Sequence, residues 1–351
     1  MNTEVFKIDP SNVELYDNEI KNAAELIKKG ELVVMPTETV YGLGGDATNP
    51  SAAEKIYSAK GRPSDNPLII HISNPSDAEE YTYTCDTYYK LAEHFMPGPL
   101  TVVLPAKETI PLKTRGGLDT VAVRCPENPI ARRLIELSEV PIAAPSANLS
   151  GSPSPTTAKH VIDDMMGRVA AIIDGGECDF GLESTIVKIE KDGSLVLLRP
   201  GKITVEELSL IADTVIASAV VGTLREGEAA ISPGMKYKHY APKSPVVLLD
   251  GEIEKCASYI EGQGEKNIAI ICYTGDVEYM KKRLPDAFFF EFGMREDVDT
   301  QAHRLFSILR KTDDYSFTTV YAPLPEKNGI GLALYNRMIR AAAHRIVKVD
   351  N

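Results

Sequence analysis

The sequence predicts a two-domain α/β protein, with a larger N-terminal domain built on a twisted mixed sheet and a smaller Rossmann-like C-terminal domain. Short apolar runs alternate with amphipathic helical patterns along the chain, as in domains that mix strands and helices. A length of 351 residues is enough for two cores. Residues 1–213 carry the whole formal net charge of −12, whereas residues 214–351 are balanced. We therefore expect domains at residues 1–213 and 244–351, joined by a linker over residues 214–243.

In the first domain, a 3.6-residue apolar period predicts helices, and short apolar runs predict strands. The predicted helices are Glu19–Lys29, Ser51–Ala59, Thr87–Phe95, Pro129–Ser138 and Thr156–Met166. The predicted strands are Glu31–Met35, Pro67–His71, Leu100–Leu104, Thr120–Arg124, Ile142–Ala144, Ala170–Asp174, Ser184–Ile189 and Leu195–Arg199.

In the second domain, strands and helices alternate, which indicates a small parallel sheet. The predicted strands are Pro245–Asp250, Asn267–Tyr273, Ala287–Phe292 and Thr318–Tyr321, and the helices Ile253–Ile260, Val277–Arg283, Thr300–Lys311 and Leu332–His344. Between the domains, the pattern breaks down from Ala217 to Lys243 into a segment rich in Gly, Pro and charge. A loop of this length is usually functional or disordered.

Composition limits the class of protein. The chain is 43% hydrophobic and 25% charged, and it has no apolar run near the ~20 residues that span a bilayer. Its start lacks a secretory pattern. The five cysteines show no CxxC spacing and are interpreted as reduced thiols, neither a disulfide frame nor a zinc site. We therefore expect a cytoplasmic protein, and the acidic charge argues against a general nucleic-acid binder.

The stretch VVMPTETVYGLGGDA (33–47) resembles a phosphate loop at first sight. It matches neither GxxxxGK[ST] nor GxGxxG, because Gly45 is followed by Asp46 and Ala47. What remains is a strand that delivers Thr37, Glu38 and Thr39 to its end and then bends through glycines. Two interpretations stay open: a tight strand-to-helix turn, or a strand end that binds a polar ligand.

Other polar residues also follow predicted strands or break helices. Lys60 and Arg62 lie two apart in a Gly/Pro-broken segment, which is either a solvated basic loop or an anion site. Proline-restricted hydroxyls and an amide follow the strand that ends near Pro145, and Arg124 and Arg199 close two further strands. Pooled, these features predict a cleft for an anionic, hydroxyl-rich ligand such as a nucleotide. They include no obvious nucleophile.

Eight short motifs, in order along the chain, resemble one known family. They are PTETVYGLG, KGRPSDNPL, FMPGPLTVVL, GLDTVAVR, PIAAPSANLSG, GLESTIV, LLRPG and PGMKYKHYAP. Together they resemble the YrdC-type threonylcarbamoyl-AMP synthases in their long, two-domain form. The resemblance runs from about Ile20 to Pro242, and the remaining residues are similar to the smaller C-terminal domain of that form.

The resemblance implies that L-threonine, bicarbonate (or CO2) and ATP give threonylcarbamoyl-AMP and pyrophosphate. It implies Mg²⁺ on the triphosphate, held mainly by phosphates and water with no protein ligand named. The product would pass to a separate transferase that modifies tRNA, so that tRNA is not needed for this step and no membrane is involved. Such a reaction needs positioning and charge stabilisation more than acid–base groups.

The resemblance also implies which residues form the site. On the ATP side it implies Lys60, Arg62, Asn66, Thr120, Ala144 (through its backbone), Ser146, Asn148, Ser154 and Arg199, with Tyr237 closing over the nucleotide from the linker. Lys60, Arg62, Ser146 and Asn148 would act in catalysis. On the threonine side it implies Thr39, His71, Arg124 and Ser184, with Arg124 as the carboxylate partner. Two plainer interpretations stay open, namely that His71 is a satisfied strand-end histidine and that Ser154 caps the helix that follows.

Two other functions compete with the synthase. A double-stranded RNA-binding protein would use a concave basic face of the YrdC fold, against which the net charge counts. A carbamoyl-transferase module would resemble the YrdC-like part of larger hydrogenase-maturation proteins, whose zinc-finger cysteines this chain lacks.

Overall fold

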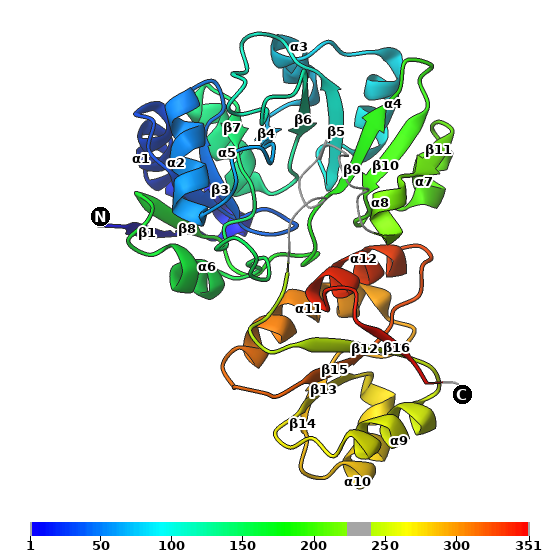
Figure 1. Cartoon of the computed structure of the whole chain (residues 1–351). Coiled ribbons are helices and arrows are strands. Elements are labelled where there is room, and N and C mark those ends of the chain that lie inside the picture. Colours follow the sequence, from blue (N-terminus) through cyan, green and yellow to red (C-terminus); the bar gives the residue numbers. More distant parts are fainter. Residues whose placement is uncertain (1, 223–239, 350–351) are drawn as a thin grey trace. The chain divides into compact units, whose positions relative to one another are not determined.

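The computed structural model describes residues 2–222 and 240–349. This part of the chain divides into two compact units, one of residues 2–150 and 154–222 and the other of residues 151–153 and 240–349 (Figure 1). Each unit contains its own sheet, so that there are two separate cores. None of the helices in the described ranges is long and apolar enough to cross a membrane.

An eleven-stranded mixed sheet forms the frame of the first unit. Its strands are β1 (Glu4–Lys7), β2 (Val33–Met35), β3 (Gly42–Asp46), β4 (Ile69–His71), β5 (Leu100–Pro105), β6 (Thr120–Arg124), β7 (Ile142–Ala143), β8 (Ala171–Asp174), β9 (Thr185–Ile189), β10 (Leu195–Arg199) and β11 (Thr214–Ile216). They lie in the order β1-β8-β2-β3-β7-β4-β6-β5-β9-β10-β11. Because β4 pairs parallel with β6 while β5 pairs antiparallel with it, the mixed sheet predicted from the sequence is confirmed.

The helices of the first unit are α1 (Asp17–Lys28), α2 (Pro50–Lys60), α3 (Ala78–Tyr81), α4 (Asp86–Phe95), α5 (Pro129–Ser138), α6 (Ala158–Met165), α7 (Val205–Ser209) and α8 (Ser218–Val221), with 3-10 turns η1 (Pro10–Tyr16) and η2 (Pro75–Asp77). Four helices of the first unit, α2, α5, α6 and α7, begin at a residue whose side chain accepts from a free N–H group. Asn128 accepts from the N–H groups of Ile130 and Ala131 at the start of α5, which also has proline in its first turn. The apolar faces of α1 and α5 share one buried cluster with β2, β7 and β8.

The glycine-rich stretch is a strand, which corrects the prediction of a sharp bend. Residues Gly42–Asp46 form β3, antiparallel to both β2 and β7. A Cβ at Gly44 would lie 2.9 Å from a side-chain carbon of Ile142 and 3.0 Å from the Val33 carbonyl oxygen. The glycines are therefore needed for close packing between neighbouring strands, and not for a turn.

The sheet of the first unit also continues beyond residue 213, where the sequence analysis ends the domain. Strand β11 pairs parallel with β10, and α8 follows it. Both elements are short and lack a clear apolar period, as does β1 at the other edge, so that none of the three is predicted from local sequence.

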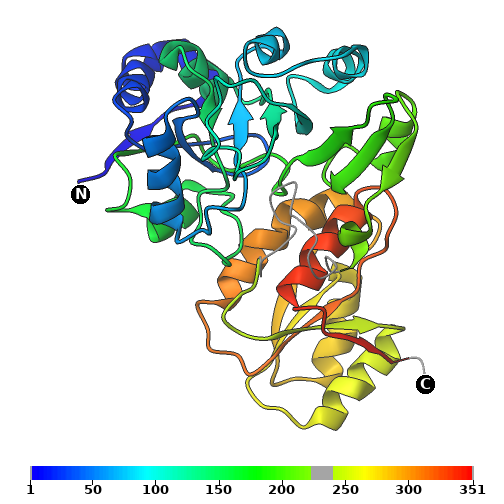
Figure 2. The same cartoon turned by 45° about the horizontal axis from the view of Figure 1, so that its top comes forward.

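The second unit is a five-stranded, fully parallel sheet. Its strands are β12 (Val246–Asp250), β13 (Ala269–Cys272), β14 (Phe288–Glu291), β15 (Val320–Pro323) and β16 (Ile346–Lys348), in the order β14-β13-β15-β12-β16. The helices are α9 (Ile253–Gln263), α10 (Val277–Arg283), α11 (Val298–Thr312) and α12 (Gly331–Ala341), with a 3-10 turn η3 (Thr274–Asp276). Figures 1 and 2 show α9 and α10 on one face of this sheet and α11 and α12 on the other. The Rossmann-like layering predicted for this domain is thus confirmed.

Candidate active site

The first group of predicted residues surrounds the end of α2. Lys60 is the last residue of this helix, which stops because Gly61 takes a left-handed conformation with φ of 63°. Lys60 is buried, and its Nζ donates to the carbonyl oxygens of Ser146 and Asn148, the latter at 2.6 Å. The Ser146 hydroxyl donates to Asn148 Oδ1 at 2.6 Å. Lys60 at the end of α2 therefore forms one polar group with Ser146 and Asn148 in the loop after β7, which lie 86 and 88 residues further along the chain.

The neighbouring loop carries Arg62 and Asn66. The Arg62 guanidinium donates to the carbonyl oxygens of Asn66, at 3.4 Å, and Pro67, at 3.1 Å. The side chain of Asn66 is buried, yet its Oδ1 has no hydrogen-bond partner in the described part of the chain. Buried polar atoms are nearly always satisfied, so an unsatisfied one calls for a ligand or water. Asn66 is thus suited to a ligand contact.

The second group lies at the ends of the parallel strands β4 and β6. His71 and Arg124 are direct register partners there. Arg124 donates to Glu38 Oε1 at 2.6 Å, with side-chain exposures of 5% for the arginine and 2% for the glutamate. The remaining buried Nε of Arg124 has no acceptor among the described residues. The arginine is therefore held by one carboxylate and still has a donor for another.

His71 lacks a charge at neutral pH. Burial, helped by the nearby Arg124, lowers the pKa of His71 to about 3. Its Nδ1 donates to the Ile142 carbonyl oxygen at 3.3 Å, which sets the tautomer. The interpretation of His71 as a satisfied strand-end histidine therefore agrees with the structure, and its neutral ring lies next to Arg124.

A third group continues across the sheet from Arg124. Thr101 on β5 is the register partner of Arg124, and its hydroxyl lies 2.7 Å from that of Ser184. Arg199 donates to the Ser184 carbonyl oxygen and to its hydroxyl, both at 3.0 Å. The structure therefore joins Arg124, Ser184 and Arg199 through neighbouring strands.

Four predicted residues have other surroundings. The hydroxyl of Thr39 is fully buried, 2.9 Å from that of Thr37. The N–H of Ala144 already donates to the Ile69 carbonyl oxygen at 2.9 Å. Thr120 is half-buried at the opposite end of β6 from Arg124. Tyr237 lies outside the described residues.

Ser154 does not cap a helix. Its hydroxyl donates to Glu183 Oε1 at 2.5 Å, and both side chains are buried. The cap of α6 is instead Thr157, whose hydroxyl accepts from the His160 N–H. The plainer interpretation of Ser154 is therefore wrong.

Glu38 and Glu183 were not among the residues predicted for the site, although the sequence places Glu38 with Thr37 and Thr39 after a strand. Glu38 stands between two threonines in the PTETV motif, and a carboxylate three residues after an apolar strand was a usable signal. Its partner Arg124 is 86 residues away, and no local pattern joins the two.

Two family models match the chain. One, described as "Telomere recombination" and labelled Sua5_yciO_yrdC, covers residues 25–201. The other, described as "Threonylcarbamoyl-AMP synthase, C-terminal domain", covers residues 203–343.

Relatives match over almost the whole length. A threonylcarbamoyl-AMP synthase of Pyrococcus abyssi is 43% identical, with 94% of this chain and 96% of the relative covered. One of Bacillus subtilis (strain 168) is 41% identical, with 95% of each covered.

Solved structures agree with the relatives. The crystal structure of P. abyssi Sua5 complexed with L-threonine matches with a TM-score of 0.87 at 40% identity, covering 99% of this chain and all of the other. E. coli YciO matches with a TM-score of 0.51 at 26% identity, covering 57% of this chain and 96% of the other. The fold is thus that of the YrdC-like α/β proteins. The match of both family models and of full-length relatives shows that the chain belongs to the Sua5/YrdC family, in its two-domain form.

Proposed function

We propose that this protein is a nucleotidyltransferase that makes threonylcarbamoyl-AMP and pyrophosphate from L-threonine, bicarbonate (or CO2) and ATP. This is the first step of threonylcarbamoyl-adenosine formation in tRNA. The observation that carries the proposal is the full-length similarity to relatives named threonylcarbamoyl-AMP synthase, at 43% and 41% identity. The three polar groups of the first unit, around Lys60, Arg124 and Ser184, support it.

Arg124 would bind the carboxylate of threonine. Its guanidinium is buried, is held by Glu38, and has an Nε–H without an acceptor in the described ranges. A second carboxylate at this place would satisfy that donor. Glu38 would be a positioning residue, since it contacts Arg124 and not the reacting atoms. Thr39, His71 and Ser184 would complete the threonine side, and the uncharged His71 would leave Arg124 as the cation that selects the carboxylate.

The Lys60 group would bind the phosphates. Threonine's neutral amine first adds to CO2 and releases a proton (from bicarbonate, water leaves), which gives a carbamate. A carbamate oxygen then attacks the α-phosphorus as the bond to the pyrophosphate oxygen breaks. Negative charge then grows on the phosphate oxygens, where Lys60 and Arg62 would stabilise it. Lys60 would exchange one carbonyl contact for a phosphate oxygen. The ATP side would also include Asn66, Thr120, Ala144, Ser146, Asn148, Ser154, Arg199 and Tyr237.

Mg²⁺ would accompany ATP. The residues proposed for the phosphates are cations, amides and hydroxyls, which suit phosphate oxygens better than they suit a metal ion. The ion would screen the triphosphate and orient its leaving group. We also propose a cytoplasmic location and transfer of the product to a separate tRNA-modifying enzyme, without a need for tRNA in this step.

The test is to incubate the protein with ATP, ¹³C-bicarbonate and each amino acid in turn. Pyrophosphate release with threonine, together with a threonylcarbamoyl-AMP mass that carries the ¹³C label, is the expected result. Pyrophosphate release without label in the product would refute carbamate chemistry. Salt-dependent RNA binding without any turnover would instead favour the RNA-binding alternative.

A further inference from the structure

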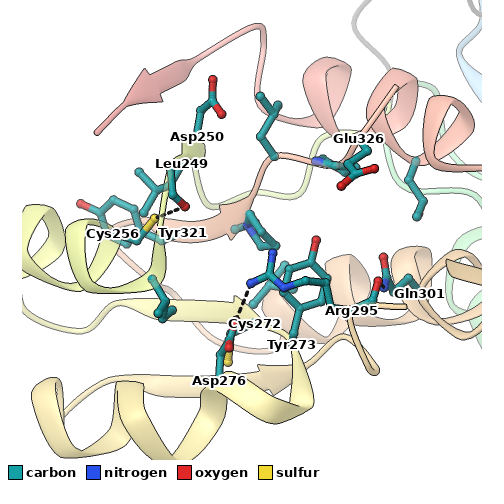
Figure 3. A pocket seen from close by; sticks show the side chains of 18 of the residues that line it. Leu249, Asp250, Cys256, Cys272, Tyr273, Asp276, Arg295, Gln301, Tyr321 and Glu326 are labelled. Atoms are coloured by element: carbon teal, nitrogen blue, oxygen red, sulfur yellow. Dashed lines mark hydrogen bonds and ion pairs between the residues drawn. The ribbon is translucent and has the colours of Figure 1, made fainter. Parts of the chain in front are cut away.

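A cavity of about 660 Å³ lies in the second unit, at the carboxyl ends of its parallel strands. Leu249 and Asp250 end β12, Cys272 and Tyr273 end and follow β13, and Pro323 ends β15 (Figure 3). Strand β15 lies between β12 and β13 in the sheet. The chain leaves β12 and β13 toward α9 and α10 on one face and leaves β15 toward α12 on the other face, so that a crevice opens between these connections. Crevices at such points in open α/β sheets are where ligands bind, and pockets for small molecules measure about 300–1,000 Å³.

The floor of this cavity is apolar. Ile260, Ile270, Met280 and Leu334 line it and are almost fully buried, as is the ring of Tyr321. A ligand that fills the cavity would therefore place an apolar part on this floor.

The rim of the cavity is strongly acidic. Of the charged residues that line it, Arg295 is basic, whereas the acidic ones are Asp250, Glu252, Asp276, Glu296 and Glu326. Arg295 donates to Asp276 at 3.0 Å and stacks on the Tyr273 ring with its guanidinium carbon 4.3 Å from the centroid. One carboxylate is thus neutralised by the protein itself, and four others face the crevice or its mouth.

Two nearly buried polar side chains offer acceptors to the cavity. Tyr273 is 8% exposed, and its hydroxyl has no hydrogen-bond partner among the described residues. Figure 3 shows this hydroxyl pointing into the space bounded by Glu326 and Gln301. Gln301 is 3% exposed, and its amide group donates to the carbonyl oxygens of Met294 and Arg295, which leaves its own oxygen unused by these bonds. The Tyr273 ring is largely buried while its hydroxyl reaches the cavity, so a polar group of a ligand can meet it there.

We propose that this crevice binds a small organic cation, a molecule with a protonated amine beside an apolar body. The amine would lie among Glu326, the Tyr273 hydroxyl and the Gln301 oxygen, and the apolar body on the floor. A phosphate group is disfavoured, because the turn from β12 to α9, where Rossmann-like folds hold phosphate, reads Asp250-Gly251-Glu252 and carries two carboxylates. The proposal does not depend on the synthase reaction.

Tryptamine is a suitable probe, because the chain contains no tryptophan and indole fluorescence reports the ligand alone. We would titrate tryptamine with the full-length protein and follow its anisotropy at low and high salt. Two further indoles, each titrated alone in the same way, separate charge from shape: tryptophol, the neutral counterpart with a hydroxyl, and indole-3-propionate, an anion. ATP is added to tryptamine as a competitor without an indole. Saturable tryptamine binding that weakens with salt is expected, with much weaker binding of the other two indoles and little competition by ATP.

Point variants locate the binding. Glu326→Gln and Tyr273→Phe should each weaken tryptamine about threefold to fivefold, the range for partly exposed polar contacts. Asp286→Asn is the matched control, since Asp286 precedes β14 at the amino ends of the strands, away from the cavity at their carboxyl ends, and this variant should bind tryptamine as wild type does. Absence of saturable binding, equal binding of tryptophol, or binding unchanged in both pocket variants would overturn the proposal.

Discussion

The buried ion pair between Glu38 and Arg124 gives the sharpest test of the first unit. In Glu38→Gln the side chain keeps its shape and an acceptor oxygen, but Arg124 loses its compensating charge. Both side chains are at most 5% exposed, and their atoms are 2.6 Å apart. Breaking such a pair by removing one partner costs about 3–5 kcal/mol. We therefore expect a loss of about 3 kcal/mol of unfolding free energy.

The loss is measurable as a thermal shift. For a unit of this size, 1 kcal/mol corresponds to about 2–4 °C, so the melting temperature of the first unit should fall by about 6–12 °C. Circular dichroism or calorimetry would follow the transition. Glu31→Gln is the matched control, because Glu31 pairs with Lys55 at 2.8 Å but with side chains 34% and 43% exposed. An exposed pair contributes about 0–1 kcal/mol to stability, so the melting temperature of this variant should hardly change.

A second variant separates charge from packing. In the double variant Glu38→Gln with Arg124→Gln no unpaired charge remains, so part of the lost stability should return. Threonine binding should not return, since the carboxylate partner is gone. A melting temperature for Glu38→Gln within about 2 °C of the Glu31→Gln value would refute the reasoning that this buried charge needs its partner.

Three further predictions follow from the same unit. Lys60→Ala and Arg62→Ala should each lower pyrophosphate release by about 10²-fold with the fold intact, whereas Lys159→Ala, whose side chain is 81% exposed, should not; near wild-type turnover in the first two variants would contradict their role at the phosphates. The pKa of His71 is lowered to about 3 in the folded state from 6.5, so only the unfolded chain takes up this proton between those values, and stability should fall as the pH drops below about 6.5, by about 2 kcal/mol at pH 5. Urea unfolding at pH 7 and pH 5 measures this, and a His71→Gln variant with the same pH slope as wild type would exclude His71 as the cause. Serine should be a poorer substrate than threonine by about 1–3 kcal/mol, and valine should be rejected more strongly because a polar group is left without its hydroxyl partner; valine turnover equal to that of threonine, measured by product mass, would argue against a threonine pocket.

Local signals in the sequence were sufficient for the regular elements. Helix α5 was predicted at its true bounds because Asn128, Pro129 and an apolar face all lie within one stretch. Strand β6 was found for the same reason, since its apolar run is closed by charged residues on both sides. Strand β3 was missed because its glycines are required by Ile142 and Val33, which come close only in the folded sheet.

The site also combines features that local sequence predicts with features that depend on distant residues. Its motifs located the Lys60 and Arg124 groups, because each motif ends a strand or helix. The contacts inside the groups could not be predicted, since Lys60 reaches Ser146 and Arg124 reaches Glu38 across 86 residues each. The crevice of the second unit has no motif, because separate strand ends and loops line it.

The outermost strand of the larger sheet has a practical consequence. Strand β1 is only four residues long, and it pairs along the whole of β8, whose first three residues are buried. Cutting the chain after residue 7 would uncover the backbone of an apolar segment, Ala-Ile-Ile, that is ready to pair with another molecule. In β1 itself, Glu4 and Lys7 put opposite charges at the border of the sheet. We therefore expect a shortened protein to aggregate during purification. The first seven residues cover this strand edge and so oppose self-association.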